Sequence, residues 1–448
     1  MRAYVLERSG IYASGFSKLG GIVVDDPASA DLIHIGPDAG LSPEEVEGLI
    51  RSARSNGAVV SIAPGPSIDP ERLGKAILPL ADRLHLDEEG ARVLSGIDDP
   101  VESARRIEGR MAPGSLLTLR LGSGGFVVLK DRTLIELSPL PYFNVKDRIG
   151  YGETFSCAID YLLSTGRGLK EAAILAAGDA RATLERPGGK EGQLDEEGIK
   201  ALLRNYDLIE EEREGVLRLR FELPQVKALF LDMDGLMALT EDIHMEAFEE
   251  LMRRKGFEGF KLSPEEQAYF VGRDTLEDCR YLKERYGLEG DLEEIFEERQ
   301  RIYFELVRRR GVPPNDGLEE IFETAKRKGI KMIVTTNSPD YDVKVILESM
   351  FRTMGMEVSP WEFFDGFSTV SKVERSKPEP DVYLLAIDMA GVDPRHCVVL
   401  EDSESGVLSA RRAGIMRVLA VPHRYTMGQD FSEAFAVLSG LREALKFI

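Results

Sequence analysis

The chain has 448 residues, 43% of them hydrophobic and 30% charged, and this length suits two globular domains better than one. A formal net charge of −21 argues against nucleic acid or an anionic membrane as a partner. The sequence contains no run of about 18 apolar residues, no signal-peptide core at its start, and no disulfide or zinc spacing among its three cysteines. We therefore expect a globular protein of the cytoplasm.

Over residues 1–208, short apolar runs alternate with helical patterns. Ser42-Pro43-Glu44-Glu45 has the features of a helix start, with a capping serine, a proline at the first helical position and acids in the first turn. Such alternation predicts a doubly wound α/β sheet. The expected strands are 32–35, 59–62, 83–86 and 115–120 and a hairpin of 127–130 with 133–137, and the expected helices lie near 71–80, 100–109, 154–164 and 169–184.

A glycine-flanked turn, Gly150-Tyr-Gly152-Glu153, lies at the start of the helix expected near 154–164. Backbone N–H groups at a helix N-terminus can bind a phosphate, and an acid there can remove a proton from an attacking hydroxyl. Residues 147–155 resemble the signature of the ribokinase-like (PfkB) carbohydrate kinases, D-T-x-G-A-G-D-x-F, and 122–125 resemble that family's nucleotide-side glycines. The resemblance implies a ribokinase-like domain over residues 1–208, whose candidates for a nucleotide or anion site that would take ATP are Gly122, Gly125, Gly150, Gly152 and Glu153.

The same region departs from the family pattern. Glu153 stands in place of the catalytic aspartate, Tyr151 in place of an alanine, and Asp87-Glu88-Glu89-Gly90 in place of the metal-associated N-x-x-E motif. The domain would also be truncated at its N-terminus, where the family carries much of its sugar site. A displacement of a catalytic group by about 1 Å can lower the rate on the order of 100-fold. An active sugar kinase, and a degenerate domain kept for binding, regulation or homodimer formation, both remain open.

Residues 209–224 begin with an acidic run, continue as an alternating apolar and polar stretch, and end at Pro224. We expect a linker that includes an edge strand, followed by a second domain of residues 225–448. That domain opens with an apolar run that leads into Asp232-Met-Asp234-Gly235. A continuous apolar run fits a strand buried in a parallel sheet, and open α/β sheets bind ligands at the carboxyl ends of such strands.

A helix entry containing Thr240 and His244 follows, and residues 243–310 are almost all helical in pattern. We expect an inserted helical cap at about 241–312, because a lid over a site requires such a mobile insertion. Two later apolar runs end in Thr336-Asn337-Ser338 and in Glu401-Asp402, and Lys377 lies between them.

Each of these features alone is typical of an ordinary turn, helix cap or surface residue. Together, in this order, they resemble the four motifs of the haloacid dehalogenase (HAD) superfamily over residues 226 to about 425. The resemblance implies an α/β, Rossmann-like fold with a helical cap. It assigns Asp232 as the nucleophile that forms an aspartyl-phosphate and Asp234 as the general acid and base.

The resemblance also implies a magnesium site. Asp232 and Asp402 would ligate Mg²⁺ through their side chains, Asp234 through its backbone carbonyl, and Glu401 would lie beside them. Three further residues have implied roles: Lys377 neutralises charge on the nucleophile and on the transferring group, and Thr336 and the N–H of Asn337 hold phosphate oxygens.

The position of the cap and the Glu-Asp-Ser-x-x-Gly motif resemble subfamily I, in the branch of β-phosphoglucomutase and phosphoglycolate phosphatase. In that branch a histidine at the position of His244 contacts the general acid, and Thr240 lies at the cap hinge. Residues 272–274 match a cap loop over the substrate, which makes Arg273 a candidate anion contact. The implied substrate contacts are Asn337, His244 and Arg273.

These features predict a Mg²⁺-dependent phosphatase of a small phosphorylated metabolite, and the kinase-like first domain suggests a sugar phosphate. Dehalogenase activity is disfavoured, because the full magnesium-binding acid set and the second aspartate are both present. Two alternatives remain open. A phosphomutase would use the same motifs with a hydroxyl as the phosphoryl acceptor, and a bifunctional sugar kinase–phosphatase would retain an active first domain.

Overall fold

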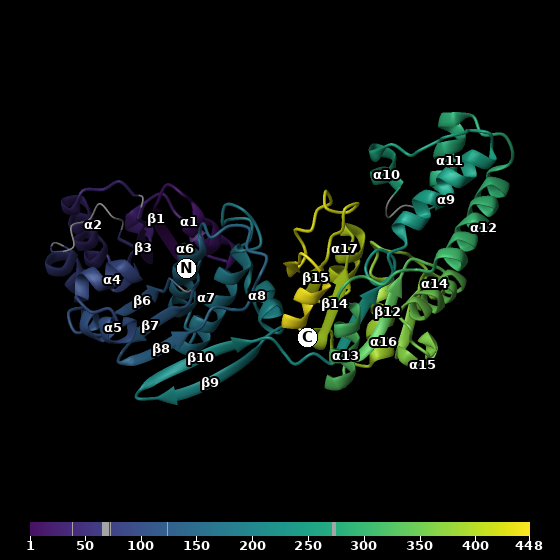
Figure 1. Cartoon of the computed structure of the whole chain (residues 1–448). Coiled ribbons are helices and arrows are strands. Elements are labelled where there is room, and N and C mark those ends of the chain that lie inside the picture. Colours follow the sequence, from purple (N-terminus) through teal and green to yellow (C-terminus); the bar gives the residue numbers. More distant parts are fainter. Residues whose placement is uncertain (38, 65–70, 72, 123, 271–274) are drawn as a thin grey trace. The chain divides into compact units, whose positions relative to one another are not determined.

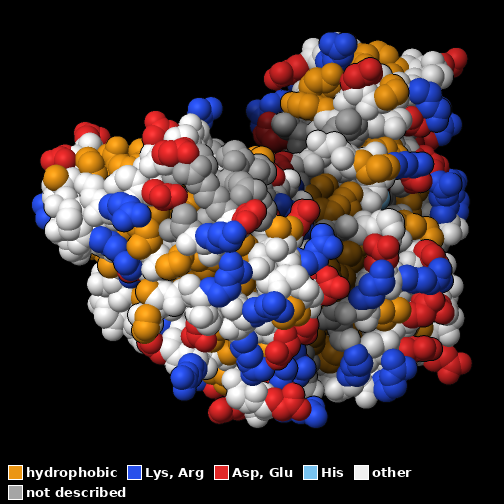
Figure 2. Space-filling model, turned by 90° about the vertical axis from the view of Figure 1, so that its left-hand side faces the viewer, with side chains coloured by type: hydrophobic (Ala, Val, Ile, Leu, Met, Phe, Trp, Pro, Cys, Tyr) orange, Lys and Arg blue, Asp and Glu red, His pale blue; other side chains and the backbone are white. Residues whose placement is uncertain are grey.

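The computed structural model describes residues 1–448 apart from 38, 65–70, 72, 123 and 271–274. The chain forms two compact units, Met1–Pro224 and Gln225–Ile448, each of which is described by itself. Within the described ranges, no helix combines the length and the apolarity needed to cross a bilayer. Figure 2 shows acidic and basic side chains interspersed over one face of the molecule.

The first unit is built on a ten-stranded sheet in the order β2-β1-β3-β4-β5-β6-β7-β8-β10-β9. Neighbouring strands from β2 to β6 are parallel, β7 runs antiparallel to β6 and β8, β10 is parallel to β8, and β9 is antiparallel to β10. The strands are β1 (Arg2–Leu6), β2 (Ile22–Val23), β3 (Leu32–Ile35), β4 (Val59–Ile62), β5 (Arg83–Asp87), β6 (Leu116–Arg120), β7 (Phe126–Lys130), β8 (Thr133–Leu137), β9 (Asp207–Arg213) and β10 (Val216–Glu222).

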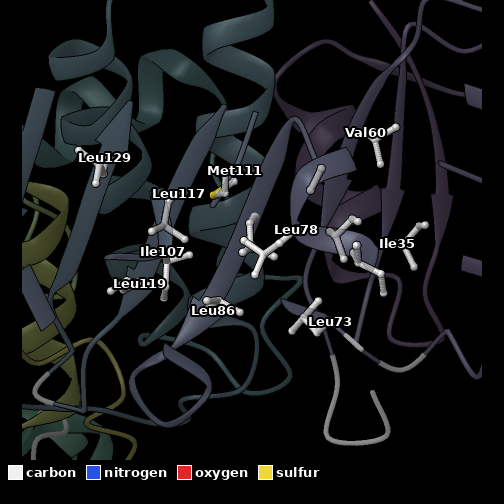
Figure 3. Packing of buried hydrophobic residues seen from close by; sticks show 14 of the residues in the cluster. Ile35, Val60, Leu73, Leu78, Leu86, Ile107, Met111, Leu117, Leu119 and Leu129 are labelled. Atoms are coloured by element: carbon white, nitrogen blue, oxygen red, sulfur yellow. The ribbon is translucent and has the colours of Figure 1, made fainter. Parts of the chain in front are cut away.

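Helices pack on both faces of this sheet. One core contains Ile107 and Leu117 and joins the sheet to α2, α4 and α5 (Figure 3), and a second core, which contains Tyr12, joins it to α1 and α6. Adjacent residues of β3 divide between them: Leu32 belongs to the second core and Ile33 to the first, as the alternation of a strand requires. The helices are α1 (Ile11–Lys18), α2 (Pro43–Ser55), α4 (Glu88–Ser95), α5 (Pro100–Glu108), α6 (Tyr151–Ser164), α7 (Leu169–Thr183) and α8 (Glu196–Leu203).

The strands expected in the first unit are confirmed, but the helices differ. The range 71–80 is not one α-helix: Leu73–Ile77 form a π-helical turn and Leu78–Leu80 a 3-10 turn that contains Pro79, whose ring supplies no N–H to an α-helix. Two strands, β1 and β2, and three helices, α1, α4 and α8, were not expected from the sequence. Asp87 caps α4 by accepting a hydrogen bond from Gly90 N at 2.8 Å, so the stretch compared with the N-x-x-E motif is a helix start.

The segment 209–224, expected as a linker, instead belongs to the first sheet. β9 and β10 form a hairpin there, and Val216, Leu219 and Phe221 are buried because alternate side chains of β10 face the core. The acidic strand β9 is the outer edge, where charged side chains hinder further pairing. The strand expected at 216–223 is therefore present as β10, but it lies inside the sheet between β8 and β9, and β9 is the edge strand. The boundary between the units falls at Pro224.

The second unit is built on a six-stranded, fully parallel sheet in the order β13-β12-β11-β14-β15-β16, with β11 in the interior. Its strands are β11 (Ala228–Asp232), β12 (Lys331–Thr336), β13 (Gly366–Thr369), β14 (Cys397–Glu401), β15 (Arg417–Ala420) and β16 (Ala436–Val437). The helices that follow β12 in the chain are α14 (Asp340–Thr353), α15 (Pro360–Phe363), α16 (Asp381–Ala390) and α17 (Glu404–Arg412).

Helices inserted between β11 and β12 occupy the range expected for the cap. Figure 1 shows α9 to α12 as a group beyond the strands of the sheet, and α9 packs along α12. They are α9 (Glu241–Arg254), α10 (Pro264–Phe270), α11 (Thr275–Tyr286) and α12 (Leu292–Arg310), and α13 (Leu318–Lys328) returns the chain to β12.

Candidate active site

Three neighbouring strands bring the predicted motifs together. β11 lies between β12 and β14, and Asp232 pairs in register with Thr335. All three strands are parallel, so their carboxyl ends meet at one edge of the sheet, the usual ligand-binding edge of such folds. Asp232, Thr336 and Glu401 each end one of these strands, and all three are buried.

Lys377 links two of these strand ends. Its Nζ donates hydrogen bonds to Asp232 Oδ1 at 2.6 Å, to Glu401 Oε1 at 2.5 Å and to the Thr335 carbonyl at 3.1 Å. Burial alone would lower the pKa of Lys377, but the neighbouring carboxylates raise that pKa well above its usual value. The side chain is therefore a buried ammonium ion held against the predicted nucleophile.

Asp232, Glu401 and Asp402 form a buried cluster of carboxylates whose nearest oxygens lie within 4.8 Å of one another. Burial and mutual repulsion raise the pKa values of Asp232 and Asp402 well above their usual range. Lys377 supplies one positive charge against three carboxylates. A divalent cation would supply the remaining charge, and oxygen-only ligands suit Mg²⁺, so the donor set fits the predicted metal.

Gly235 and His423 pack against Asp402. His423 Nε2 lies 2.7 Å from Asp402 Oδ2. Gly235 has a φ of +78°, and a Cβ at this position would lie 2.2 Å from Asp402 Oδ2 and 2.7 Å from His423 Nε2. Only glycine fits this space, so Gly235 lets the two side chains meet. No sequence motif contains His423, which lies on the loop after β15.

Asp234 is held by hydroxyl groups. Its Oδ1 accepts a hydrogen bond from Thr240 Oγ1 at 2.9 Å, and its Oδ2 accepts one from Ser338 Oγ at 2.7 Å and lies 3.5 Å from Thr336 Oγ1. Burial raises the pKa of Asp234, while the bonds from Ser338 and Thr240 act in the opposite direction. The carboxyl group is thus oriented and has a raised pKa, as a proton donor near neutral pH requires.

The three predicted substrate contacts have different positions. His244 Nδ1 lies 2.6 Å from Arg299 Nη2, and its ring stacks on Tyr303 at 4.2 Å, so the expected contact with Asp234 is replaced by one with cap helix α12. Asn337 accepts a hydrogen bond from Lys377 N at 2.9 Å, and its side chain therefore braces the loop that carries the lysine. Arg273 lies outside the described residues.

Of the five candidates in the first unit, two line one cavity. Gly152 and Glu153 line a cavity of about 570 Å³, whereas Gly122, Gly125 and Gly150 are not among its lining residues. Gly122 N already donates to Glu88 Oε2 at 2.7 Å. Gly125 is required by packing, because a Cβ there would lie 2.5 Å from the Leu137 carbonyl oxygen. Gly150, which precedes α6, has a φ of +82°. Glycine adopts this backbone conformation more readily than other residues, which accounts for a glycine at this position.

Comparison with known proteins places the second unit in a family. Residues 226–414 match the model of the haloacid dehalogenase-like hydrolases. The chain is 30% identical over 215 residues to protein CbbY of Rhodobacter capsulatus, covering 47% of this chain and 91% of that protein. It is 31% identical over 216 residues to the phosphorylated carbohydrates phosphatase of Thermotoga maritima, covering 47% of this chain and 93% of that protein.

Among solved structures, CbbY of Rhodobacter sphaeroides in complex with phosphate aligns with a TM-score of 0.43 and 26% identity, over 49% of this chain and 96% of that one. The family match covers the residues that form the carboxylate and lysine cluster. Through its second unit, the chain belongs to the haloacid dehalogenase-like hydrolases.

Proposed function

We propose that this protein is a Mg²⁺-dependent phosphatase that hydrolyses a small phosphorylated carbohydrate through an aspartyl-phosphate on Asp232. The observation that carries the proposal is the position of Lys377 Nζ, 2.6 Å from Asp232 Oδ1 within a cluster of three buried carboxylates. A phosphate dianion could approach such a cluster only if positive charge offsets its repulsion.

The first step forms a bond from Asp232 to phosphorus and breaks the bond from phosphorus to the leaving oxygen. Lys377 offsets charge on the nucleophile and on the transferring group, and Thr336 and the N–H of Asn337 hold phosphate oxygens. A cation bound by Asp232, Asp402 and the Asp234 carbonyl, beside Glu401, would add the remaining positive charge.

Asp234 moves the protons of both steps. In the first step its carboxyl group donates a proton to the leaving oxygen, and Thr240 and Ser338 hold it in one orientation. In the second step the carboxylate accepts a proton from water as the water oxygen attacks phosphorus and releases Asp232. Inorganic phosphate and the free alcohol are the products.

The substrate class is inferred from the relatives. One relative, 31% identical, is named for its action on phosphorylated carbohydrates. The cap helices α9 to α12 follow the nucleophile strand directly, and a cap in this position would select the organic part of the substrate. The candidate contacts on the core side are Asn337 and Thr336.

The test is a screen of sugar phosphates with the full-length protein, measuring release of inorganic phosphate with Mg²⁺ and with a chelator. We expect release that requires Mg²⁺ and falls at least about 10³-fold in Asp232→Asn, because the nucleophile is lost. Asp388→Asn, an exposed position on α16, is the matched control and should keep full activity. Unchanged phosphate release in Asp232→Asn would refute the proposal.

Consumption of substrate without phosphate release, with an isomeric sugar phosphate as product, would indicate the mutase alternative. The same screen with unphosphorylated sugars and ATP tests the first unit for kinase activity. Sugar phosphorylation that is abolished by Glu153→Gln and retained in Asp232→Asn would establish a bifunctional enzyme.

A further inference from the structure

The loop that follows β15 contacts both the predicted metal site and the cap of the second unit. His423, near the start of this loop, lies against Asp402. The next two residues, Arg424 and Tyr425, contact Asp242 in the first turn of α9. Because 182 positions separate Arg424 from Asp242, this contact arises from the tertiary fold and not from local structure. One short loop therefore joins two parts of the site that belong to different segments.

Hydrogen bonds determine how His423 contacts Asp402. The Nδ1 atom of His423 accepts a hydrogen bond from Tyr425 N at 3.3 Å, so Nδ1 carries no proton. The ring proton is then on Nε2, which donates to Asp402 Oδ2 at 2.7 Å. A donor in this position suits an ionised carboxylate, which is the form that binds a cation. His423 therefore ties the orientation of Asp402 to the position of the loop.

The loop is braced on the turn that carries Asp402. Thr426 is fully buried, and its Oγ1 accepts a hydrogen bond from His423 N at 3.0 Å, while Thr426 N donates to the His423 carbonyl at 2.9 Å. Farther along the loop, Gln429 Oε1 accepts a hydrogen bond from Glu404 N at 2.8 Å. Glu404 begins α17, two residues after Asp402. The loop and the metal-site turn are thus held together at both ends of the loop.

Arg424 and Tyr425 converge on one oxygen of Asp242. Tyr425 Oη donates to Asp242 Oδ1 at 2.8 Å, and Arg424 Nη2 pairs with the same oxygen. Arg424 Nη2 also donates to Tyr425 Oη at 2.8 Å, and its guanidinium carbon lies 4.6 Å from the centre of the tyrosine ring. An isolated ion pair at the surface contributes little, because ordering two long side chains opposes it. Here the two side chains orient each other, which reduces that cost.

The first turn of α9 also holds the predicted general acid. Asp242 lies two residues after Thr240, whose Oγ1 donates to Asp234 Oδ1 at 2.9 Å. Just before this turn, Leu239 N donates to the Pro313 carbonyl at 3.0 Å, so the two chain connections of the cap run side by side. A rotation of the cap about these connections would move Asp242 away from the loop. The contacts at Asp242 therefore oppose opening of the cap.

We propose that residues 423–427 are a latch between the cation site and the cap. His423 fixes this latch on Asp402, and Arg424 and Tyr425 hold the first turn of α9 through Asp242. Arg424 and Tyr425 are positioning residues, because they act through Asp242. A cation that fixes Asp402 favours the closed latch, and by linkage the closed latch raises the affinity for the cation by the same factor. The cation's identity rests on the proposed function, whereas the latch itself can be measured without cation or substrate.

Hydrogen exchange followed by mass spectrometry measures the latch in the full-length protein, with a chelator and without substrate. The double variant Arg424→Ala/Tyr425→Phe leaves the sequence of α9 unchanged. Loss of an exposed ion pair and of one hydrogen bond changes an equilibrium about three- to tenfold, so the amides of α9 should exchange faster by that factor. Exchange in β12 should stay the same. Arg352→Ala, at an exposed arginine of α14, is the matched control and should change neither rate.

Asp242→Ala tests the other side of the same contact. The side chains of Arg424 and Asp242 are 62% and 64% exposed, so these substitutions leave the core intact. Asp242→Ala also removes an acid from the first turn of a helix, which by itself affects α9. The comparison of two backgrounds removes this effect: Asp242→Ala should accelerate α9 exchange about three- to tenfold more in the wild type than in the double variant, where the contact is already lost.

Calorimetric titration with Mg²⁺ tests the link to the cation site. In the wild type, Mg²⁺ should slow the exchange of α9. The double variant should bind Mg²⁺ more weakly, by about the same factor by which Mg²⁺ slows that exchange. Arg352→Ala should bind Mg²⁺ as the wild type does.

The possible failures are distinguishable. Unchanged α9 exchange in the double variant, or equal effects of Asp242→Ala in both backgrounds, would overturn the latch. Wild-type Mg²⁺ affinity in the double variant would overturn its link to the cation site. Failure of the wild-type protein to bind Mg²⁺ would refute both this link and the proposed function, and the exchange measured with chelator would still decide whether the loop holds the cap.

Discussion

Replacement of Lys377 by methionine tests the electrostatic account of the active site most directly. The substitution keeps the volume of the side chain and removes the ammonium ion that contacts Asp232 and Glu401. Removal of one partner from a buried ion pair typically lowers the free energy of unfolding by about 3–5 kcal/mol, because the other charge is left uncompensated. Two carboxylates lose their partner here, so the upper part of that range is expected.

The chain contains a single tryptophan, Trp361 on α15, which lies in the second unit and contacts Phe367 at 4.2 Å between ring centroids. Its fluorescence during urea denaturation therefore reports on the unit that carries Lys377. A loss of about 3–5 kcal/mol corresponds to a midpoint lower by roughly 1–2 M urea. Lys344→Met, at an exposed lysine of α14, is the matched control and should leave the midpoint almost unchanged.

The loss of unfolding free energy in Lys377→Met should grow as the pH rises. Burial and repulsion already raise the pKa values of Asp232 and Asp402 in the folded protein, and loss of the ammonium ion removes an influence that lowers them. Groups with a raised folded-state pKa contribute stability that is present below the unfolded-state pKa and is lost as the pH rises through the folded-state pKa. Added Mg²⁺ should recover part of the loss, since it binds the folded carboxylate cluster. A variant with the wild-type midpoint, or with a deficit that does not change between pH 5 and pH 8 or on addition of Mg²⁺, would refute this reasoning.

Three further substitutions test other parts of the same site. His423→Ala should weaken Mg²⁺ binding about 10–100-fold in calorimetry, because this side chain orients a metal-ligand carboxylate; wild-type affinity would show that the contact has no such role. Ser338→Ala removes a hydrogen bond that lowers the pKa of Asp234, so the alkaline limb of the pH–rate profile should move to higher pH, and a shift to lower pH would contradict the assignment of Asp234 as the acid. Gly235→Ala should lower the unfolding temperature and Mg²⁺ affinity together. Gly391→Ala, which has a similar positive φ of +64° but no atom within 4 Å of the added Cβ, should lose only the backbone-strain contribution of about 1–3 kcal/mol and leave Mg²⁺ binding intact.

The positions of the predicted substrate contacts could not be derived from the sequence alone. His244 was expected to contact Asp234, but α9 directs its ring toward Tyr303 and Arg299 of α12. This position depends on how two cap helices pack, and the order of residues within α9 does not determine that packing. In the first unit, Gly125 matched a glycine pattern for a nucleotide, yet the carbonyl of Leu137 on a neighbouring strand accounts for it through close packing.

The sequence by itself determined the three strands that carry the site, β11, β12 and β14, and the meeting of Asp232, Thr336, Lys377 and Glu401. Apolar runs of this length must be buried, and the carboxyl ends of parallel strands meet at one edge of a sheet, so the polar residues that follow them have few other places to lie. Only the tertiary structure decided that His423 contacts Asp402 across 21 residues of chain, and that Ser61 lies between His34 and Asp160 in the first unit. The residues in these contacts come from segments that share no repeating pattern in the sequence. Loop paths and side-chain packing bring these segments together, so the contacts could not be predicted from the sequence.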